Sequence, residues 1–133
     1  MIGIVIVAHG GLAREYLSAV EHVVGRQEGI RAIAIEEDHD RAAKQAEIRA
    51  AADAVDTGEG VVVVTDMFGG SPTNLSLGAC SQADRRILYG ANLPMLIKLA
   101  KSRHLSVGAA TESALEAARK YMNAYIGTGH AAQ

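Results

Sequence analysis

A histidine followed by two glycines ends the first apolar segment of the chain. His9 comes directly after residues 2–8 (IGIVIVA) and before Gly10-Gly11, so no bulky side chain follows it for two positions. An imidazole becomes a good nucleophile when one ring N–H donates a hydrogen bond to a carboxylate and the other nitrogen keeps its lone pair. Asp66, at the end of the apolar segment 60–66 (GVVVVTD), is the carboxylate best placed to do this.

The residues after Asp66 are suited to holding an anion. Gly69 and Gly70 leave main-chain N–H groups accessible, and Ser71-Pro72 has the N-cap and first-position form of a helix start. Main-chain N–H groups at such a start attract a phosphoryl group. The pattern therefore predicts a nucleophile, an orienting carboxylate and an anion site formed by different parts of the chain.

Short β-rich segments alternate with longer helical patterns, which predicts an α/β fold with an open, mainly parallel sheet and helices on both faces. We expect strands at 2–8, 30–35, 60–66 and 86–89, and helices at 12–24, 41–55, from 71 onward and at 93–103. Ligands of such sheets gather at the carboxyl ends of the strands. If the first and third strands are neighbours, His9 and Asp66 meet at that edge.

The C-terminal part of the sequence leaves alternatives open. Three positions could cap the last helix: Ser106, Thr111, or Ser113 with Glu116 in a capping box. Apolar residues alternate over 121–126, which favours a final edge strand, although a continued helix fits nearly as well. We expect one domain over residues 1–126 and a tail over 127–133.

Other residues capable of chemistry have weaker support. The remaining histidines lack metal-ligand spacing, so we expect no metal site: His22, His39, His104 and His130. Only His39 lies on the same predicted edge as His9. Cys80 is expected in the core, and as the single cysteine it favours a reducing, cytoplasmic setting. Arg14 is expected in solvent or, alternatively, against an acidic patch of a partner.

Composition excludes several classes of protein. The chain has 133 residues, 49% of them hydrophobic and 21% charged, as expected of one globular domain. A net charge of −2, no tryptophan and one phenylalanine argue against a nucleic-acid partner. No apolar run is long enough for a transmembrane helix. The nucleotide-binding and serine-hydrolase motifs, such as the Walker A loop, GxGxxG and GxSxG, are missing from the sequence.

Three segments together resemble a known family. They are IVIVAHGGLA (4–13), VVVVTDMFGGSPTN (61–74) and ANLPML (91–96). In this order they resemble the enzyme IIA domain of the mannose family of the bacterial phosphoenolpyruvate:sugar phosphotransferase system. The resemblance extends over residues 1 to about 126.

The resemblance implies a phosphotransferase component that needs no cofactor. His9 would take a phosphoryl group from the phosphocarrier HPr and pass it to a IIB partner. Asp66 would orient His9, and Ser71 with the Gly69–Gly70 backbone would hold the phosphoryl group. The resemblance also implies a homodimer that exchanges its last strand, 121–126. At the remaining matching position, Asn92, a structural cap and a contact to the site are equally good interpretations.

Several functions remain open at this point. The sequence ends at Gln133 without the Ala/Pro-rich linker that leads into a IIB domain in many relatives, so we expect IIB to be a separate protein. The phosphorylation state of His9 could instead serve regulation without sugar transport. The chain could also be the phosphoryl donor subunit of a dihydroxyacetone kinase. A binding module that holds a small anion beside an unmodified His9 is the least favoured interpretation.

Overall fold

A computed structural model of the chain describes residues 1–67, 69–81, 84–127 and 130–131. Strands and helices alternate along most of the chain, as the sequence predicts. Their order is β1 (Gly3–His9), α1 (Leu12–Val24), β2 (Ile30–Ile35), α2 (Arg41–Val55), β3 (Val61–Thr65), α3 (Ser71–Ser76), the 3-10 helix η1 (Leu77–Cys80), β4 (Arg85–Leu88), α4 (Leu93–Lys101), α5 (Val107–Lys120), β5 (Tyr125–Ile126) and β6 (His130–Ala131).

The first four strands form an open, all-parallel sheet in the order β2-β1-β3-β4. In the register of this sheet, His9 lies opposite Ile35 of β2, and Val7 lies opposite Thr65 of β3. Strands β1 and β3 are therefore neighbours, and the residues that follow them meet at the carboxyl edge. This confirms the predicted fold class and the condition on which the His9–Asp66 pairing depends.

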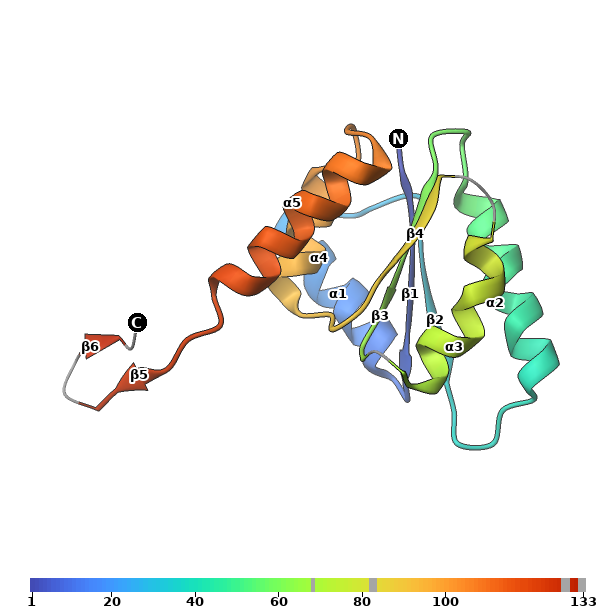
Figure 1. Cartoon of the computed structure of the whole chain (residues 1–133), viewed down its shortest axis with the longest axis horizontal. Helices are drawn as coiled ribbons and strands as arrows, with labels where there is room; N and C mark the ends of the chain where they lie inside the picture. The colour runs from blue at the N-terminus through green and yellow to red at the C-terminus, as the bar shows by residue number, and fades with distance from the viewer. Residues whose placement is uncertain (68, 82–83, 128–129, 132–133) are drawn as a thin grey trace.

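Helices cover both faces of the sheet (Figure 1). On one face, α1, α4 and α5 pack against alternate strand residues such as Ile4, Ile6 and Val64. On the other face, α2, α3 and η1 pack against the intervening residues, such as Val5 and Val63. A sheet covered on both faces needs apolar side chains at every strand position, which explains the continuous β-branched runs of β1 and β3.

Side-chain caps fix the starts of three helices. Asp40, Asn92 and Ser106 accept hydrogen bonds from main-chain N–H groups in the first turns of α2, α4 and α5. Of the three caps that the sequence offered for the last helix, the structure uses Ser106. The prediction for α3 was off by one position, because Gly70 is the N-cap there and makes no side-chain hydrogen bond. Ser71 is the first helical residue.

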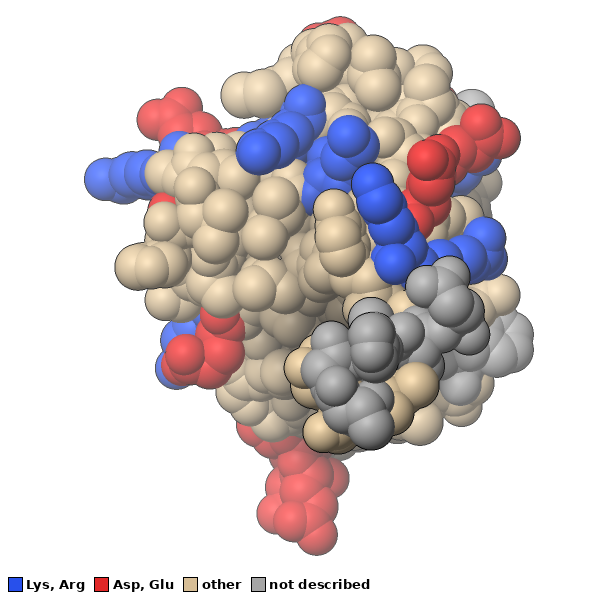
Figure 2. Space-filling view, turned by 90° about the vertical axis from the view of Figure 1, so that its left-hand side faces the viewer, with Lys and Arg blue, Asp and Glu red and all other residues tan. Residues whose placement is uncertain are grey.

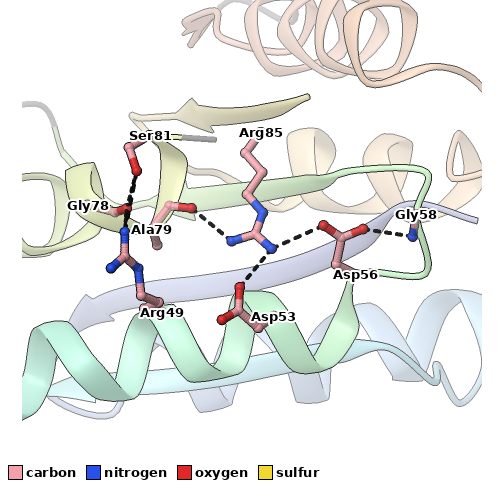
Figure 3. A network of polar contacts seen from close by, with 8 residues as sticks. All are labelled: Arg49, Asp53, Asp56, Gly58, Gly78, Ala79, Ser81 and Arg85. Atoms are coloured by element: carbon pink, nitrogen blue, oxygen red, sulfur yellow. Dashed lines mark hydrogen bonds and ion pairs between the residues drawn. The ribbon is translucent and has the colours of Figure 1, made fainter. Parts of the chain in front are cut away.

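A buried arginine links the sheet to the helix layer of α2 and η1, near the amino ends of the strands (Figure 3). The Arg85 guanidinium donates to Asp53 Oδ1 at 2.8 Å, Asp56 Oδ2 at 3.1 Å and the Ala79 carbonyl at 3.0 Å. Hydrogen bonding from the Gly58 N–H and pairing with Arg85 outweigh burial and lower the pKa of Asp56. These bonds fasten the end of α2 and η1 to the start of β4, at the opposite end of the strands from His9.

After α5 the chain extends away from the sheet and its covering helices (Figure 1). Strand β5 pairs with β6 in an antiparallel two-stranded ribbon that lies apart from the main sheet. The strand expected over 121–126 is confined to Tyr125–Ile126. Apolar side chains in this segment are exposed, with Tyr125 at 72% and Met122 at 67% of their surface in solvent.

Candidate functional site

His9 and Asp66 form a hydrogen-bonded pair at the carboxyl edge of the sheet. His9 is the last residue of β1, and Asp66 follows the last residue of β3. One carboxylate oxygen, Asp66 Oδ2, lies 2.8 Å from His9 Nδ1 and accepts the main-chain N–H of His9 at 3.0 Å. The His9 side chain is 50% exposed, whereas that of Asp66 is 11% exposed. Within the described residues, His9 Nε2 has no hydrogen-bond partner.

Electrostatics favour the ionised form of Asp66. Burial is the largest influence and raises the pKa of Asp66, but the main-chain and ring hydrogen bonds and the charge of His9 together outweigh it, leaving the pKa below its usual value. An ionised carboxylate accepts hydrogen bonds only, so Nδ1 must carry the proton that lies between them. In the neutral ring the lone pair is then on Nε2, the accessible nitrogen.

Two buried threonines hold the loop between β3 and α3 beside this pair. Thr65 and Thr73 share a hydrogen bond of 2.7 Å, and the Thr73 hydroxyl also lies 2.9 Å from the Met67 carbonyl, which it can reach as a donor. A Cβ added at Gly70 would come within 3.4 Å of His9 Cε1. The glycine therefore lets the main chain pass close to the ring, and Gly69 has a φ of +80°, which also favours glycine.

An open hollow of about 430 Å³ adjoins His9. Its walls are His9, Gly10, Ile35, Glu36, Glu37, His39 and Ser71. The structure thus brings His9 and Ser71 together with His39, which the sequence placed only on the same edge. Acidic side chains project at this end of the molecule, whereas Lys and Arg gather over α4 and α5 (Figure 2). The acidic residues at 36–38 and 40 are a sequence feature that could have pointed to this part of the site.

Tyr16 is a neighbour of the site that the sequence analysis missed. Its hydroxyl donates to the Ala91 carbonyl at 3.1 Å. Burial and, to a lesser degree, the negative charge of Asp66 raise the pKa of Tyr16. Helical spacing places Tyr16 on the apolar face of α1 but does not show which loop its hydroxyl reaches.

The remaining candidates lie elsewhere. Asn92 caps α4 through Met95 and donates to the Ala118 carbonyl, which supports the structural interpretation of this residue. Arg14 and His22 are exposed on α1, and His104 is exposed after α4. Cys80 packs against the core beneath α2, and burial raises the pKa of its thiol to about 11, so it is not a ready nucleophile. The side chain of His130 lies outside the described part of the chain.

No helix in the part of the chain that the structure describes is long and apolar enough to cross a membrane. The fold and the site define a class: a doubly covered parallel α/β domain that presents an accessible histidine–carboxylate pair at its carboxyl edge.

Comparison with known proteins identifies the family. Residues 3–118 match the EIIA-man family, described as the PTS system fructose IIA component. Because the match covers most of the sequence, the chain belongs to this family of phosphotransferase-system IIA components.

Solved structures agree with this assignment. The EIIA phosphotransferase component of Streptococcus agalactiae is 27% identical, with a TM-score of 0.80 over 90% of this chain and 94% of that one. The IIA protein associated with the fucose utilization operon of Streptococcus pneumoniae is 25% identical, with a TM-score of 0.75 over 86% and 88%.

The mannose/sorbose-specific IIA subunit of Enterococcus faecalis shares the fold, with 22% identity and a TM-score of 0.79 over 89% of each chain. The family and these neighbours together support a phosphocarrier role in sugar phosphotransfer.

Proposed function

We propose that the protein carries a phosphoryl group on His9, accepting it from phospho-HPr and passing it to a separate IIB component in the cytoplasm. The observation that carries this proposal is the double hydrogen bond from His9 to Asp66 Oδ2, at 2.8 and 3.0 Å. It fixes the ring and directs the unprotonated nitrogen outward. A residue that merely bound an anion would need neither a fixed tautomer nor an exposed lone pair.

In the proposed step, the lone pair of His9 Nε2 attacks the phosphorus of a phosphohistidine on HPr. The new Nε2–P bond forms as the P–N bond to the HPr ring breaks, and that electron pair returns to the HPr nitrogen. The proton on Nδ1 stays in its hydrogen bond with Asp66, and the carboxylate stabilises the positive charge that develops on the ring. In transfer to IIB, a nucleophile of IIB attacks the phosphorus, the Nε2–P bond breaks, and its electron pair returns to Nε2 of His9. Catalysis then consists of in-line positioning and charge stabilisation.

Main-chain N–H groups and the Ser71 hydroxyl are proposed to hold the phosphoryl oxygens. Ser71 lines the same hollow as His9, and Gly70 approaches the His9 ring. The first N–H groups of a helix have no acceptor within that helix, so the amide of Ser71 is available to an anion. Gly69 shapes the loop that brings these groups near the ring.

Phosphorylation by the upstream chain tests this function. Incubation with phosphoenolpyruvate, enzyme I and HPr should add one acid-labile phosphoryl group to the wild type and none to His9→Ala. His22→Ala is the matched control, because His22 is an exposed histidine of α1 outside the site and its loss should leave labelling unchanged. Labelling that persists in His9→Ala, or that does not need HPr, would contradict the proposal.

The acceptor of the phosphoryl group decides between a role in sugar transport, a role in a dihydroxyacetone kinase and a purely regulatory role. Phosphorylated protein should lose its label to a IIB component in a sugar-transport role. Transfer to a dihydroxyacetone kinase subunit would assign the chain to that enzyme instead. A purely regulatory protein would keep its label in the presence of either acceptor and bind a target in only one phosphorylation state.

We further propose a homodimer in which the C-terminal segment of each copy crosses to the other. Strand β4 is at the edge of the four-stranded sheet. The segment after α5 carries exposed Tyr121, Met122, Tyr125 and Ile126. Addition of this segment to the edge of a second copy would cover apolar surface on the segment and pair the main chain of β4.

A further inference from the structure

His39 shares the hollow beside His9 although the two residues come from different elements. His9 ends β1, and His39 lies in the loop between β2 and α2. This loop starts beside the proposed nucleophile: His9 is opposite Ile35 in the sheet, and the Gly10 N–H donates to the Ile35 carbonyl at 3.0 Å. Both histidines line the same hollow of about 430 Å³.

The orientation of the His39 ring is set by one hydrogen bond. Nδ1 lies 2.8 Å from the Glu36 carbonyl oxygen, which can only accept, so Nδ1 carries a proton. The other nitrogen, Nε2, has no hydrogen-bond partner among the described residues. On protonation of the ring, Nε2 becomes a charged donor on the wall of the hollow.

The surroundings of His39 are acidic. The charged or titratable groups that line the hollow with His39 are His9, Glu36 and Glu37. Asp38, Asp40, Arg41 and Lys44 are close to it along the chain. Lys44 Nζ lies 2.8 Å from Glu47 and 3.9 Å from Glu36, so it already pairs with two carboxylates, one of which lines the hollow. Ser71, on the α3 side, is uncharged.

A phosphoryl group on His9 would add up to two negative charges beside Glu36 and Glu37. Apart from His9 itself, His39 is the only described residue lining the hollow that can become positive. We propose that protonated His39 contacts the phosphoryl group on His9 and stabilises the phosphorylated state, so that this state is favoured at lower pH. The proposal rests on phosphorylation of His9, and it adds a residue and a pH dependence to that function.

Linkage gives a test that needs no variant of His39. If protonation of His39 favours phosphorylation of His9, phosphorylation must equally favour protonation of His39. An exposed charge pair changes an equilibrium by about threefold to fivefold, so the titration midpoint of His39 should rise by roughly half a pH unit.

The midpoint can be followed by the ring proton signals of His39 in NMR spectra, before and after treatment with phosphoramidate. This reagent phosphorylates histidine without a protein donor, so the result does not depend on HPr. His22 provides the internal control, and His9→Ala treated in the same way provides the baseline. An upward shift that is absent from His9→Ala supports the contact. An unchanged or lower midpoint in the wild type would overturn it, whereas failure of HPr alone to phosphorylate His9 would count only against the proposed donor.

Two variants separate charge from structure. His39→Asn keeps an N–H donor for the Glu36 carbonyl but cannot be protonated, and His39→Lys keeps a positive charge at every pH tested. The equilibrium constant for transfer from phospho-HPr is measured from pH 6 to 8.5. The wild-type value should exceed that of His39→Asn by about threefold to fivefold at pH 6 and equal it at pH 8.5, while His39→Lys stays higher throughout. A wild-type to His39→Asn ratio that does not change with pH would refute the proposal.

Discussion

Asp66 Oδ2 accepts both the main-chain N–H and the ring Nδ1 of His9, at 3.0 and 2.8 Å. One bond holds the main chain of His9 and the other holds its ring. Together they restrict both the position of the end of β1 and the rotation of the imidazole. Asp66 Oδ1 is buried without a hydrogen-bond partner in the described part of the chain. The carboxylate is therefore dedicated to His9, which is what a group that controls the tautomer requires.

Replacement of Asp66 by asparagine should slow phosphoryl transfer strongly. The amide side chain would have nearly the same shape as the carboxylate but no charge, so it could not stabilise the ring as charge develops on it. We expect Asp66→Asn to reduce the rate of transfer from phospho-HPr by about a hundredfold. Rapid-quench measurement of labelled protein gives the rate, and circular dichroism checks the fold. A rate within twofold of the wild type would remove the assigned role.

The same substitution should show a pH-dependent effect on stability. The pKa of Asp66 is lower in the folded protein than its ordinary value, so ionisation of this group stabilises the fold above the unfolded-state pKa of about 3.9. That contribution is lost as the pH falls through the folded-state pKa. Urea unfolding should show Asp66→Asn less stable than the wild type at pH 7, with the difference shrinking below about pH 4. A difference that stays constant down to pH 3 would contradict the assigned ionisation.

Two serines at helix starts should respond in opposite ways to substitution by alanine. Ser71 is the first residue of α3 and does not cap it, whereas Ser106 caps α5 by accepting from the Ala109 N–H at 3.2 Å. Ser71→Ala should reduce transfer several-fold and leave the free energy of unfolding nearly unchanged. Ser106→Ala should leave transfer unchanged and cost about 1 kcal/mol. Transfer kinetics and urea unfolding of both variants check this. A transfer rate of Ser71→Ala equal to that of the wild type would exclude contact of Ser71 with the phosphoryl group.

Removal of residues 121–133 should convert the proposed dimer into a monomer. Helix α5 ends at Lys120, so the truncated chain keeps helices α1 to α5 and the four-stranded sheet. Light scattering after size-exclusion chromatography should give about twice the 13.9 kDa of the chain for the full-length protein and the monomer mass for the truncated one. A full-length monomer, or a truncated dimer, would show that the C-terminal segment does not hold two copies together.

The sequence predicted the scaffold well because both of its signals are local. Continuous β-branched runs and helical spacing located the four strands of the sheet and helices α1, α2 and α4 to within one or two residues, whereas three possible starts stayed open for α5. The pairing of His9 with Asp66 followed from one further assumption, that β1 and β3 are neighbours, and the structure confirms it. The role of these residues in phosphoryl transfer stays a prediction.

What the sequence did not predict depends on long-range contacts. Arginine is usually found at the surface, yet both Arg85 and Arg103 are buried. Arg103 donates to the carbonyls of Ile2 and Glu28, far away in the chain, and α4 ends before it, at Lys101. Such partners are set by the packing of the layers. Local spacing likewise could not show that Gly70, rather than Ser71, would take the cap position.

The central claim is that Asp66 holds the Nδ1 proton and leaves Nε2 of His9 as the phosphoryl acceptor. NMR of protein labelled with 15N at histidine and phosphorylated through HPr measures which ring nitrogen is bonded to phosphorus. A phosphoryl group on Nε2 of His9, with the Nδ1 proton retained, is the predicted result. A phosphoryl group on Nδ1 of His9, or on any other histidine, would contradict it.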